Sequence, residues 1–282
     1  MDGLHQQLET GRDPSSAACG LIPAPNRVRV MGIVNVTPDS FSDGGVYFHP
    51  SAAIRHGYRL MEEGADILDI GGESTRPGST PVEPEEEWAR LCPVLQELCG
   101  QAHFPVSVDT YHADTAAKAI EAGAAVINDI WGGQKEPDLL RVVAEAGCGY
   151  VWMHNREAPA EDPFEALMRE TEQGIERCLE AGVAPDKLWI DPGIGFGKTY
   201  EHNLTILKRL KTYCGFPYPV LLGVSRKRFI GLTLGVDVDE RLEGSLAVAA
   251  AGVLAGVRAL RVHDVRATVR LCRMIEAIQH AD

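Results

Sequence analysis

The sequence has little positive charge for its size. Its 282 residues include 27 lysines and arginines against 40 aspartates and glutamates, a formal net charge of −13 at pH 7. The mean field of such a chain repels polyanions, so nucleic acids and anionic membranes are excluded as general partners. A small anionic substrate remains compatible, because a few local cations are enough to hold a phosphate.

Paired cysteines and long apolar runs are also missing. The seven cysteines are scattered, without a Cys-x-x-Cys pair, which argues against a disulfide framework or a zinc site and predicts a reducing, cytoplasmic setting. No apolar stretch is long and clean enough to span a membrane. Residues 1–26 lack the basic start and apolar run of a signal peptide. We interpret them as a flexible tail that precedes a single domain, residues 27–282.

What the chain does contain is a repeated alternation of two kinds of segment. Apolar, β-branched runs, typical of strands buried on both faces, recur at Val28–Val36, Ile67–Ile70, Val106–Asp109, Val126–Ile130, Tyr150–Met153, Leu188–Ile190, Val220–Val224 and Leu260–Val262. Segments with helical periodicity lie between and after them, at Ser51–Glu63, Pro84–Leu98, Ala113–Ala122, Pro137–Ala146, Pro163–Ala181, Tyr200–Lys211, Leu242–Leu254 and Val265–Ile278.

This alternation predicts an α/β fold, a (β/α)₈ TIM barrel. The length fits, since such barrels typically take about 250 residues. A doubly wound open sheet is the alternative. The placement of polar residues favours the barrel, because most strands run into polar, charged or glycine-rich sequence at their C-terminal ends, where barrels carry their active sites.

Carboxylate and amide side chains end three of the predicted strands. Asp109 ends the third, Asn128 and Asp129 end the fourth, and Asp191 follows the sixth. Any one of them is also compatible with a helix cap. Together at one barrel mouth they predict a pocket for a flat, polar heterocycle, because a carboxylate accepts two parallel N–H bonds and an amide both donates and accepts.

Two glycine-rich or basic segments add to this predicted pocket. Residues 191–199 resemble a phosphate-binding loop, but Pro192 stands where that motif requires glycine, so the motif is rejected. The glycines instead suggest close backbone approach to a ring, with Phe196 exposed among them. In the basic run of residues 226–228, a solvated face is the alternative to Lys227 reaching into the barrel mouth as a point-charge donor.

The eighth strand predicts an anion site. Alternation places Arg261 and His263 on the same face, and phosphate sites near strands seven and eight are frequent in this fold. The pair is therefore interpreted as a pyrophosphate clamp, with a structural histidine as the alternative. Met153, at the end of strand five, either packs under a ligand or fills the core. The long segment after strand one, which carries Phe41, is interpreted as a loop that covers substrate, with an ordinary turn as the alternative. Arg76, in the segment after strand two, is either an anion-handling or lid residue or a surface charge.

Taken together, these segments resemble the dihydropteroate synthase family of pterin-binding barrels. The resemblance rests on seven motifs in family order: MGIVNVTPDSFSDGG (31–45), DIGGESTRPG (69–78), PVSVDT (105–110), INDI (127–130), DPGIGFGKTYEHN (191–203), GVSRKRFIG (223–231) and RVHD (261–264). They span nearly everything after the tail. One departure is His154-Asn155-Arg156-Glu157, where the family more often has Met and Gly after the His.

The resemblance implies a function and a set of site residues. It implies condensation of a pterin diphosphate with p-aminobenzoate, releasing pyrophosphate by an SN1-like path. The pterin site it implies comprises Asp109, Asn128, Ile130, Met153, Asp191, Lys227 and Arg261. The p-aminobenzoate site and its loops comprise Phe41, Asp43, Thr75, Arg76, Pro77, Phe196 and Ser225. The residues with catalytic roles are Asn35, Asp109, Lys227, Arg261 and His263, with Asn35 at a Mg²⁺ ion.

Two rival functions remain at this stage. A methyltetrahydrofolate-dependent corrinoid methyltransferase shares the barrel and the pterin pocket, but it needs neither the pyrophosphate clamp nor the two loop motifs. A non-catalytic pterin-binding paralogue is the second rival, and the intact motif positions argue against it. The family resemblance also implies a homodimer, with residues 242–254 and 265–278 as a contact face, and sensitivity to sulfonamides.

Overall fold

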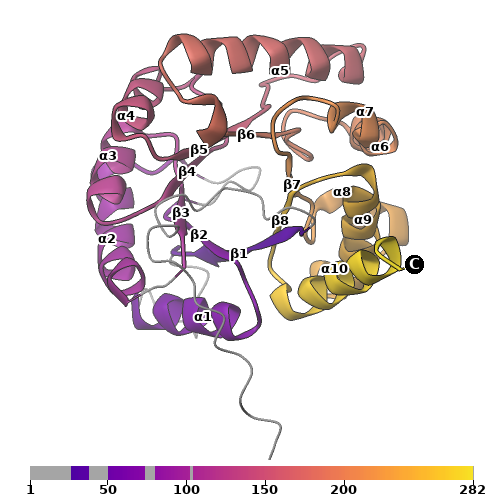
Figure 1. Cartoon of the computed structure of the whole chain (residues 1–282), viewed down its shortest axis with the longest axis horizontal. Helices are drawn as coiled ribbons and strands as arrows, with labels where there is room; N and C mark the ends of the chain where they lie inside the picture. Colours follow the sequence, from indigo (N-terminus) through magenta and orange to yellow (C-terminus); the bar gives the residue numbers. More distant parts are fainter. Residues whose placement is uncertain (1–26, 38–49, 74–79, 102–103, 282) are drawn as a thin grey trace, which may run out of the picture.

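Eight parallel strands form the centre of the protein, as the computed structural model shows for residues 27–37, 50–73, 80–101 and 104–281. The strands are β1 (Arg29–Asn35), β2 (Ile67–Gly71), β3 (Val106–Asp109), β4 (Val126–Asp129), β5 (Gly149–Met153), β6 (Leu188–Asp191), β7 (Leu221–Gly223) and β8 (Ala259–Val262). Helices surround them in a ring (Figure 1). The predicted (β/α)₈ barrel is therefore confirmed.

The strand order closes the sheet into a barrel. The hydrogen-bonded order is β6-β5-β4-β3-β2-β1-β8-β7, so β1 pairs with both β2 and β8. The last gap, between β6 and β7, is closed by a parallel bridge between Ile190 and Val220, beside a hydrogen bond from Ile190 N to Pro219 O of 3.0 Å. A doubly wound open sheet has two free edges, so this closure rules it out.

The interior of the barrel has an apolar floor beneath a polar layer. The floor is a cluster of inward-facing side chains, Met31, Ile67, Val126, Val151, Trp189, Leu221 and Ala259. Because side chains in a strand alternate with period two, the next inward position on each strand lies two residues later. Seven strands contribute to this floor. On six of them, all but β1, the next inward position carries Asp69, Asn128, Met153, Asp191, Gly223 or Arg261. The strand period alone thus gathers polar groups over an apolar floor.

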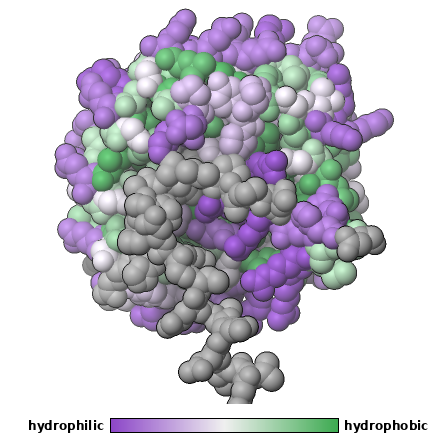
Figure 2. Space-filling model, viewed as in Figure 1, coloured by the Kyte–Doolittle hydropathy of each residue, from purple (hydrophilic) through white to green (hydrophobic). Residues whose placement is uncertain are grey.

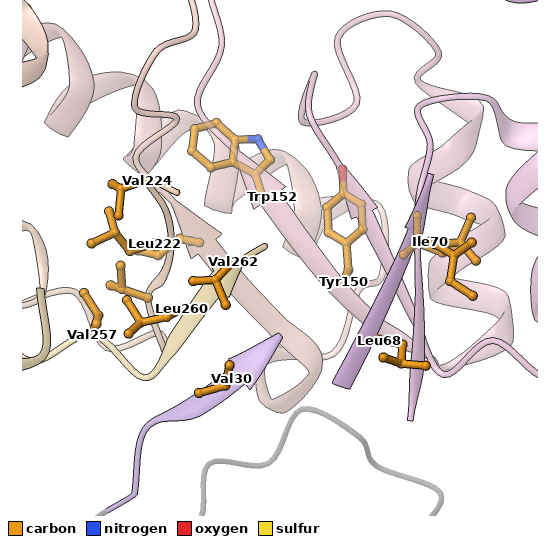
Figure 3. Packing of buried hydrophobic residues seen from close by; sticks show 14 of the residues in the cluster. Val30, Leu68, Ile70, Tyr150, Trp152, Leu222, Val224, Val257, Leu260 and Val262 are labelled. Atoms are coloured by element: carbon orange, nitrogen blue, oxygen red, sulfur yellow. The ribbon is translucent and has the colours of Figure 1, made fainter. Parts of the chain in front are cut away.

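The outward faces of the strands pack against the helices. This second cluster includes Val30, Leu68, Leu260 and Val262, which Figure 3 shows on neighbouring strands. Each fully buried aliphatic side chain of this kind contributes about 1.5–3 kcal/mol. The surrounding helices are α1 (Pro50–Glu62), α2 (Pro84–Gln101), α3 (Ala113–Glu121), α4 (Asp138–Ala146), α5 (Pro163–Glu180), α6 (Tyr200–Lys208), α7 (Leu210–Tyr213), α8 (Arg228–Leu234), α9 (Leu242–Ala255) and α10 (Val265–Gln279).

Most helix boundaries lie within two residues of the predicted ranges. Gly64, Gly123, Gly147 and Gly182 all adopt positive φ just after a helix, the conformation that glycine tolerates best. The prediction of one continuous helix at residues 200–211 was wrong. Arg209, at φ −100° and ψ 11°, leaves the helical region and separates α6 from α7. The short helix α8 was not predicted.

Several predicted features lie outside the described residues. They are the tail, residues 1–26, and the five loop residues Phe41, Asp43, Thr75, Arg76 and Pro77. Within the part of the chain that the structure describes, the six cysteines are all free thiols. In that same part, no helix is both long enough and apolar enough to traverse a membrane.

Candidate active site

Arg261 lies at the centre of the polar layer, between two carboxylates. Its Nε donates to Asp69 Oδ2 over 2.5 Å, and its Nη2 donates to Asp109 Oδ2 over 2.6 Å. Asp69 is fully buried and Asp109 almost so. Such charge-assisted bonds are among the stronger hydrogen bonds in proteins, and they hold the plane of the guanidinium in one orientation. Neither bond uses Nη1, so this nitrogen has no partner among the described residues and can donate to a ligand.

Asn128 joins the same network through Asp69. Its Nδ2 donates to Asp69 Oδ2 over 3.1 Å, so this one oxygen accepts from both Asn128 and Arg261. The other oxygen, Oδ1, is buried without a hydrogen-bond partner. Sequence analysis did not select Asp69 as a site residue. The available signal was a single acidic residue inside an otherwise apolar strand, ILDIG.

Asp191 and Lys227 complete the polar layer on the β6–β7 side. The backbone N–H of Gly193 donates to Asp191 Oδ1 over 2.7 Å, which fixes the carboxylate. A Cβ atom placed on Gly223 would lie 3.8 Å from Asp191 Oδ2, 3.9 Å from Arg261 Cβ and 4.0 Å from Lys227 Nζ. The absence of a side chain at Gly223 therefore leaves room between groups of both charges.

Burial shapes the protonation of this layer. It raises the pKa of Asp109 to about 7, against the opposing effect of Arg261. Burial also raises the pKa of Asp191, with Lys227 opposing. It lowers the pKa of Lys227 to about 8, against the attraction of Asp191. Each shift follows from the cost of a charge held away from water. Clustered groups with displaced pKa values in a concave site are typical of functional sites.

A loop rich in glycine forms one wall of the site. Lys227 Nζ donates to the carbonyl oxygen of Ile194 and lies 4.6 Å from the ring centroid of Phe196. The lysine therefore donates to a carbonyl of the protein itself and also makes a cation–π contact, while its predicted bond to a ligand stays a prediction. Gly193, Gly195 and Gly197 all have positive φ, which allows the backbone of this loop to turn tightly beside the site.

Ser225 and His263 lie together at the neighbouring ends of β7 and β8. The backbone N–H of His263 donates to Ser225 Oγ over 3.2 Å, and His263 Nδ1 lies 3.1 Å from the same oxygen. Between Ser225 and Lys227, Arg226 has φ +54°, the one positive value at a non-glycine residue in the described part of the chain. Its side chain pairs with Asp264 at 2.9 and 2.7 Å. This strained turn directs Ser225 and Lys227 into the site.

The remaining predicted residues lie around this centre. Asn35 is half-buried at the end of β1, where it pairs in register with Gly71 of β2. Met153 is buried at the end of β5, in register with Asp191. Ile130 is buried just after β4, and its carbonyl accepts from Asn155 Nδ2 over 2.9 Å. In Figure 2 hydrophilic residues are visible in a hollow near the middle of the face.

The structure thus brings most of the predicted site residues to one rim. Asp109, Asn128, Asp191, Lys227 and Arg261 form the polar layer, and Asn35, Ser225 and His263 lie on the adjoining strand ends. Across the described ranges, no group of three or more His, Cys, Asp or Glu side chains is arranged to hold a metal ion. The site is therefore suited to a flat ligand that offers N–H donors to carboxylates and a carbonyl or ring nitrogen to a lysine.

Comparison with known proteins agrees with this chemistry. Residues 31–263 match the family model described as "Pterin binding enzyme". The dihydropteroate synthase of Bacillus subtilis is 44% identical over 250 residues, which cover 88% of each chain. The Xanthomonas albilineans dihydropteroate synthase solved with 4-aminobenzoic acid is 44% identical, with a TM-score of 0.88 and coverage of 91% of this chain and 94% of that one.

A second structure of the Xanthomonas albilineans enzyme contains 7,8-dihydropteroate. It is 41% identical, with a TM-score of 0.85, and the match covers 92% of this chain and 96% of that chain. The family model covers more than half of the sequence, and these relatives match along nearly their whole length. The chain belongs to the family of pterin-binding enzymes, among its dihydropteroate synthases.

Proposed function

We propose that the protein joins 6-hydroxymethyl-7,8-dihydropterin diphosphate to p-aminobenzoate, giving 7,8-dihydropteroate and pyrophosphate. The observation that carries this proposal is the polar layer. It consists of Asp69, Asp109, Asn128 and Arg261, with Asp191 and Lys227 on the β6–β7 side. It offers acceptors for the amino and ring N–H groups of a pterin and a donor for its carbonyl. The guanidinium of Arg261 supplies a flat cationic surface against which the ring stacks.

The diphosphate is assigned to the adjoining strand ends. Asn35 ends β1 and His263 follows β8, two strands that pair with each other, and Arg261 lies on β8. Hydrogen-bond donors placed where negative charge develops stabilise a transition state. As the bond between the pterin CH₂ carbon and the diphosphate oxygen breaks, the oxygen keeps the electron pair, and these donors stabilise it.

A Mg²⁺ ion fits this part of the site. The amide oxygen of Asn35 is a hard donor, and Mg²⁺ usually takes only one or two protein ligands, the rest coming from phosphate oxygens and water. When bound, the ion would neutralise charge on the diphosphate. This chain's own contribution is the single oxygen of Asn35 together with the nearby donors of His263 and Arg261.

The p-aminobenzoate ring is assigned to the outer wall formed by Phe196 and Ser225. Its amine is a weak nucleophile, whereas the pterin methylene cation is stabilised by resonance, so departure of pyrophosphate before attack is the favoured order. The new C–N bond then forms, and the anilinium nitrogen releases a proton to solvent. This order requires no strong general base in the site.

A homodimer is part of the proposal. The large apolar side chains with the highest exposure, Leu254, Ile278 and Met274 at 61–63%, lie on α9 and α10, which pack side by side (Figure 1). Exposed apolar surface of this kind favours a protein contact. Sedimentation of the intact chain tests this, and a Leu254→Glu, Ile278→Glu variant should sediment as a monomer.

Release of pyrophosphate tests the proposed reaction. The purified protein, the pterin diphosphate, p-aminobenzoate and Mg²⁺ should together yield pyrophosphate and dihydropteroate in equal amounts. A corrinoid methyltransferase would release no pyrophosphate, and a non-catalytic paralogue would bind the pterin without turnover. Either result would overturn the proposal.

A further inference from the structure

Lys198 joins two loops at the barrel mouth. Its Nζ donates to the carbonyls of Gly193 and Phe196, each over 2.9 Å, within the glycine-rich loop that follows β6. Just after β5, Nζ also lies 2.9 Å from Nδ1 of His154 and donates to the carbonyl of the same residue over 3.4 Å. Because an ammonium group carries at most three protons, these four neighbouring atoms use all of its donors. Lys198 therefore has no proton left with which to contact a substrate.

The protonation of His154 follows from the same contacts. His154 Nε2 lies 3.0 Å from Glu170 Oε2, a carboxylate oxygen that accepts, so the ring proton is on Nε2 and Nδ1 accepts from Lys198. Burial, with the nearby charge of Lys198, lowers the pKa of His154 to about 2, consistent with a neutral ring. Glu170 also accepts from Arg156 over 3.0 Å. Burial and the nearby Lys227 lower the pKa of Lys198 to about 7, whereas the carboxylates of Asp191 and Glu170 favour its charged form.

The two loops are in direct backbone contact. A Cβ atom on Gly193 would lie 1.8 Å from the carbonyl oxygen of His154, and one on Gly197 would lie 2.1 Å from that of Arg156. Their φ angles are +62° and +55°. Glycine allows this approach but leaves the loop free to adopt many conformations. The loop therefore depends on side-chain contacts for a single conformation, and Lys198 supplies two of them, to the carbonyls of Gly193 and Phe196.

The opposite side of this loop faces Lys227. The carbonyl of Ile194 and the ring of Phe196 are both partners of the Lys227 ammonium. A Cβ atom on Gly195 would lie 3.2 Å from Lys227 Cδ. Lys198 binds the carbonyls of Gly193 and Phe196. Ile194 lies between these two residues, and Phe196 is itself one of them. Displacement of this segment would therefore move the wall of the site together with the partners of Lys227.

We propose that Lys198 is a positioning residue for p-aminobenzoate binding, which fixes the loop from Gly193 to Phe196 and thereby places the Phe196 ring. This inference rests on the proposed function, because it takes Phe196 as part of the p-aminobenzoate site. The pterin contacts of Asp69, Asp109 and Asn128 come from other strands, so they do not depend on Lys198. Loss of Lys198 should weaken the two ligands unequally.

The test compares Lys198→Met with Lys208→Met, the same substitution at an exposed position of α6. Lys198→Met should raise the KM for p-aminobenzoate about tenfold or more, since small displacements of a binding group have large effects. Its affinity for the pterin diphosphate, measured by calorimetry without p-aminobenzoate, should fall by a clearly smaller factor relative to Lys208→Met, because Asp69, Asp109 and Asn128 do not contact this loop whereas Asp191 and Lys227 do. Amide hydrogen exchange in residues 193–196 should accelerate in Lys198→Met alone.

A second variant protects the test against a failure to fold. His154→Phe keeps a ring beside Trp152 but removes the acceptor for Lys198, and it should raise the same KM by a smaller factor. Combining the two substitutions should add little to Lys198→Met. An unchanged KM and unchanged exchange in a folded variant would overturn the proposal, as would equal losses for both ligands. Absence of turnover in the wild type would instead refute the proposed function, and hydrogen exchange would still decide the role of Lys198.

Discussion

A single carboxylate oxygen, Asp69 Oδ2, accepts hydrogen bonds from both Arg261 and Asn128, over 2.5 and 3.1 Å. Removing one partner of a buried ion pair leaves the other charge uncompensated. We expect Asp69→Ala to lower the free energy of unfolding by about 3–5 kcal/mol, measured by urea denaturation. Asp237→Ala, at an exposed position, provides the control. Equal stabilities of the two variants would contradict this role for Asp69.

Asp191→Ala should abolish measurable binding of the pterin. The carboxylate lies beside Lys227 and accepts from Gly193 N, so it is held as an acceptor for a ligand donor. A buried donor left without an acceptor costs about 1–3 kcal/mol, and more when charge is involved. Calorimetry with a pterin ligand measures the effect. Asp186→Ala, in the exposed turn just before β6, should bind normally, and near-native affinity of the Asp191 variant would refute the assignment.

His263→Ala should lower turnover more than pterin affinity. If His263 acts mainly on the departing diphosphate, its loss should raise the barrier by about 2.7–4 kcal/mol, by analogy with removal of one donor to a developing oxyanion. Steady-state kinetics combined with calorimetry separate the two effects. His280→Ala, an exposed change at the end of α10, is the matched control. Turnover equal to that of the control would remove His263 from the diphosphate site.

Pterin binding should strengthen as the pH rises from 6 to 8. Burial raises the pKa of Asp109 to about 7, so below this pH its carboxyl tends to hold a proton that a ligand N–H must displace. Affinity should therefore rise by up to about tenfold per pH unit below 7 and level off between 7 and 8, because Asp109 then has no proton to release and Lys227, with its pKa lowered to about 8, still holds its own. Calorimetry in buffers of different ionisation enthalpy counts the protons released. Asp109→Asn should release fewer, and a pH-independent affinity in the wild type would exclude Asp109 as an acceptor.

The strand ends were predictable because their signals are local. Asp109, Asn128 and Asp191 each follow or close an apolar run, and the barrel geometry then brings them together without further information. Asp69 lies two residues before the end of its strand, so it does not stand out as a residue after a strand. Only the pairing with Arg261 reveals why an acidic side chain occupies that interior position.

Other features depended on contacts that the sequence does not display. In the sequence, Lys198 is only one residue of the segment 191–199, which does not match the phosphate-loop motif. Its proposed role depends on carbonyls and a histidine ring that two loops contribute. The positive φ of Arg226 is likewise fixed from α9, since Ser245 Oγ accepts from its N–H over 2.9 Å and Arg241 donates to its carbonyl over 3.0 Å. Neither relationship follows from periodicity or turn chemistry.

The separation of Asp69 and Arg261 along the chain, 192 residues, has a consequence for biosynthesis. The acidic members of the polar layer leave the ribosome long before the arginine that neutralises them. At about 5–20 residues per second, the wait is roughly 10–40 s. Until β8 is added, Asp69 and Asp109 have no cation to compensate them, so the nascent barrel should stay open and hydrated there. The last strand both completes the barrel wall and supplies the arginine that compensates the buried carboxylates.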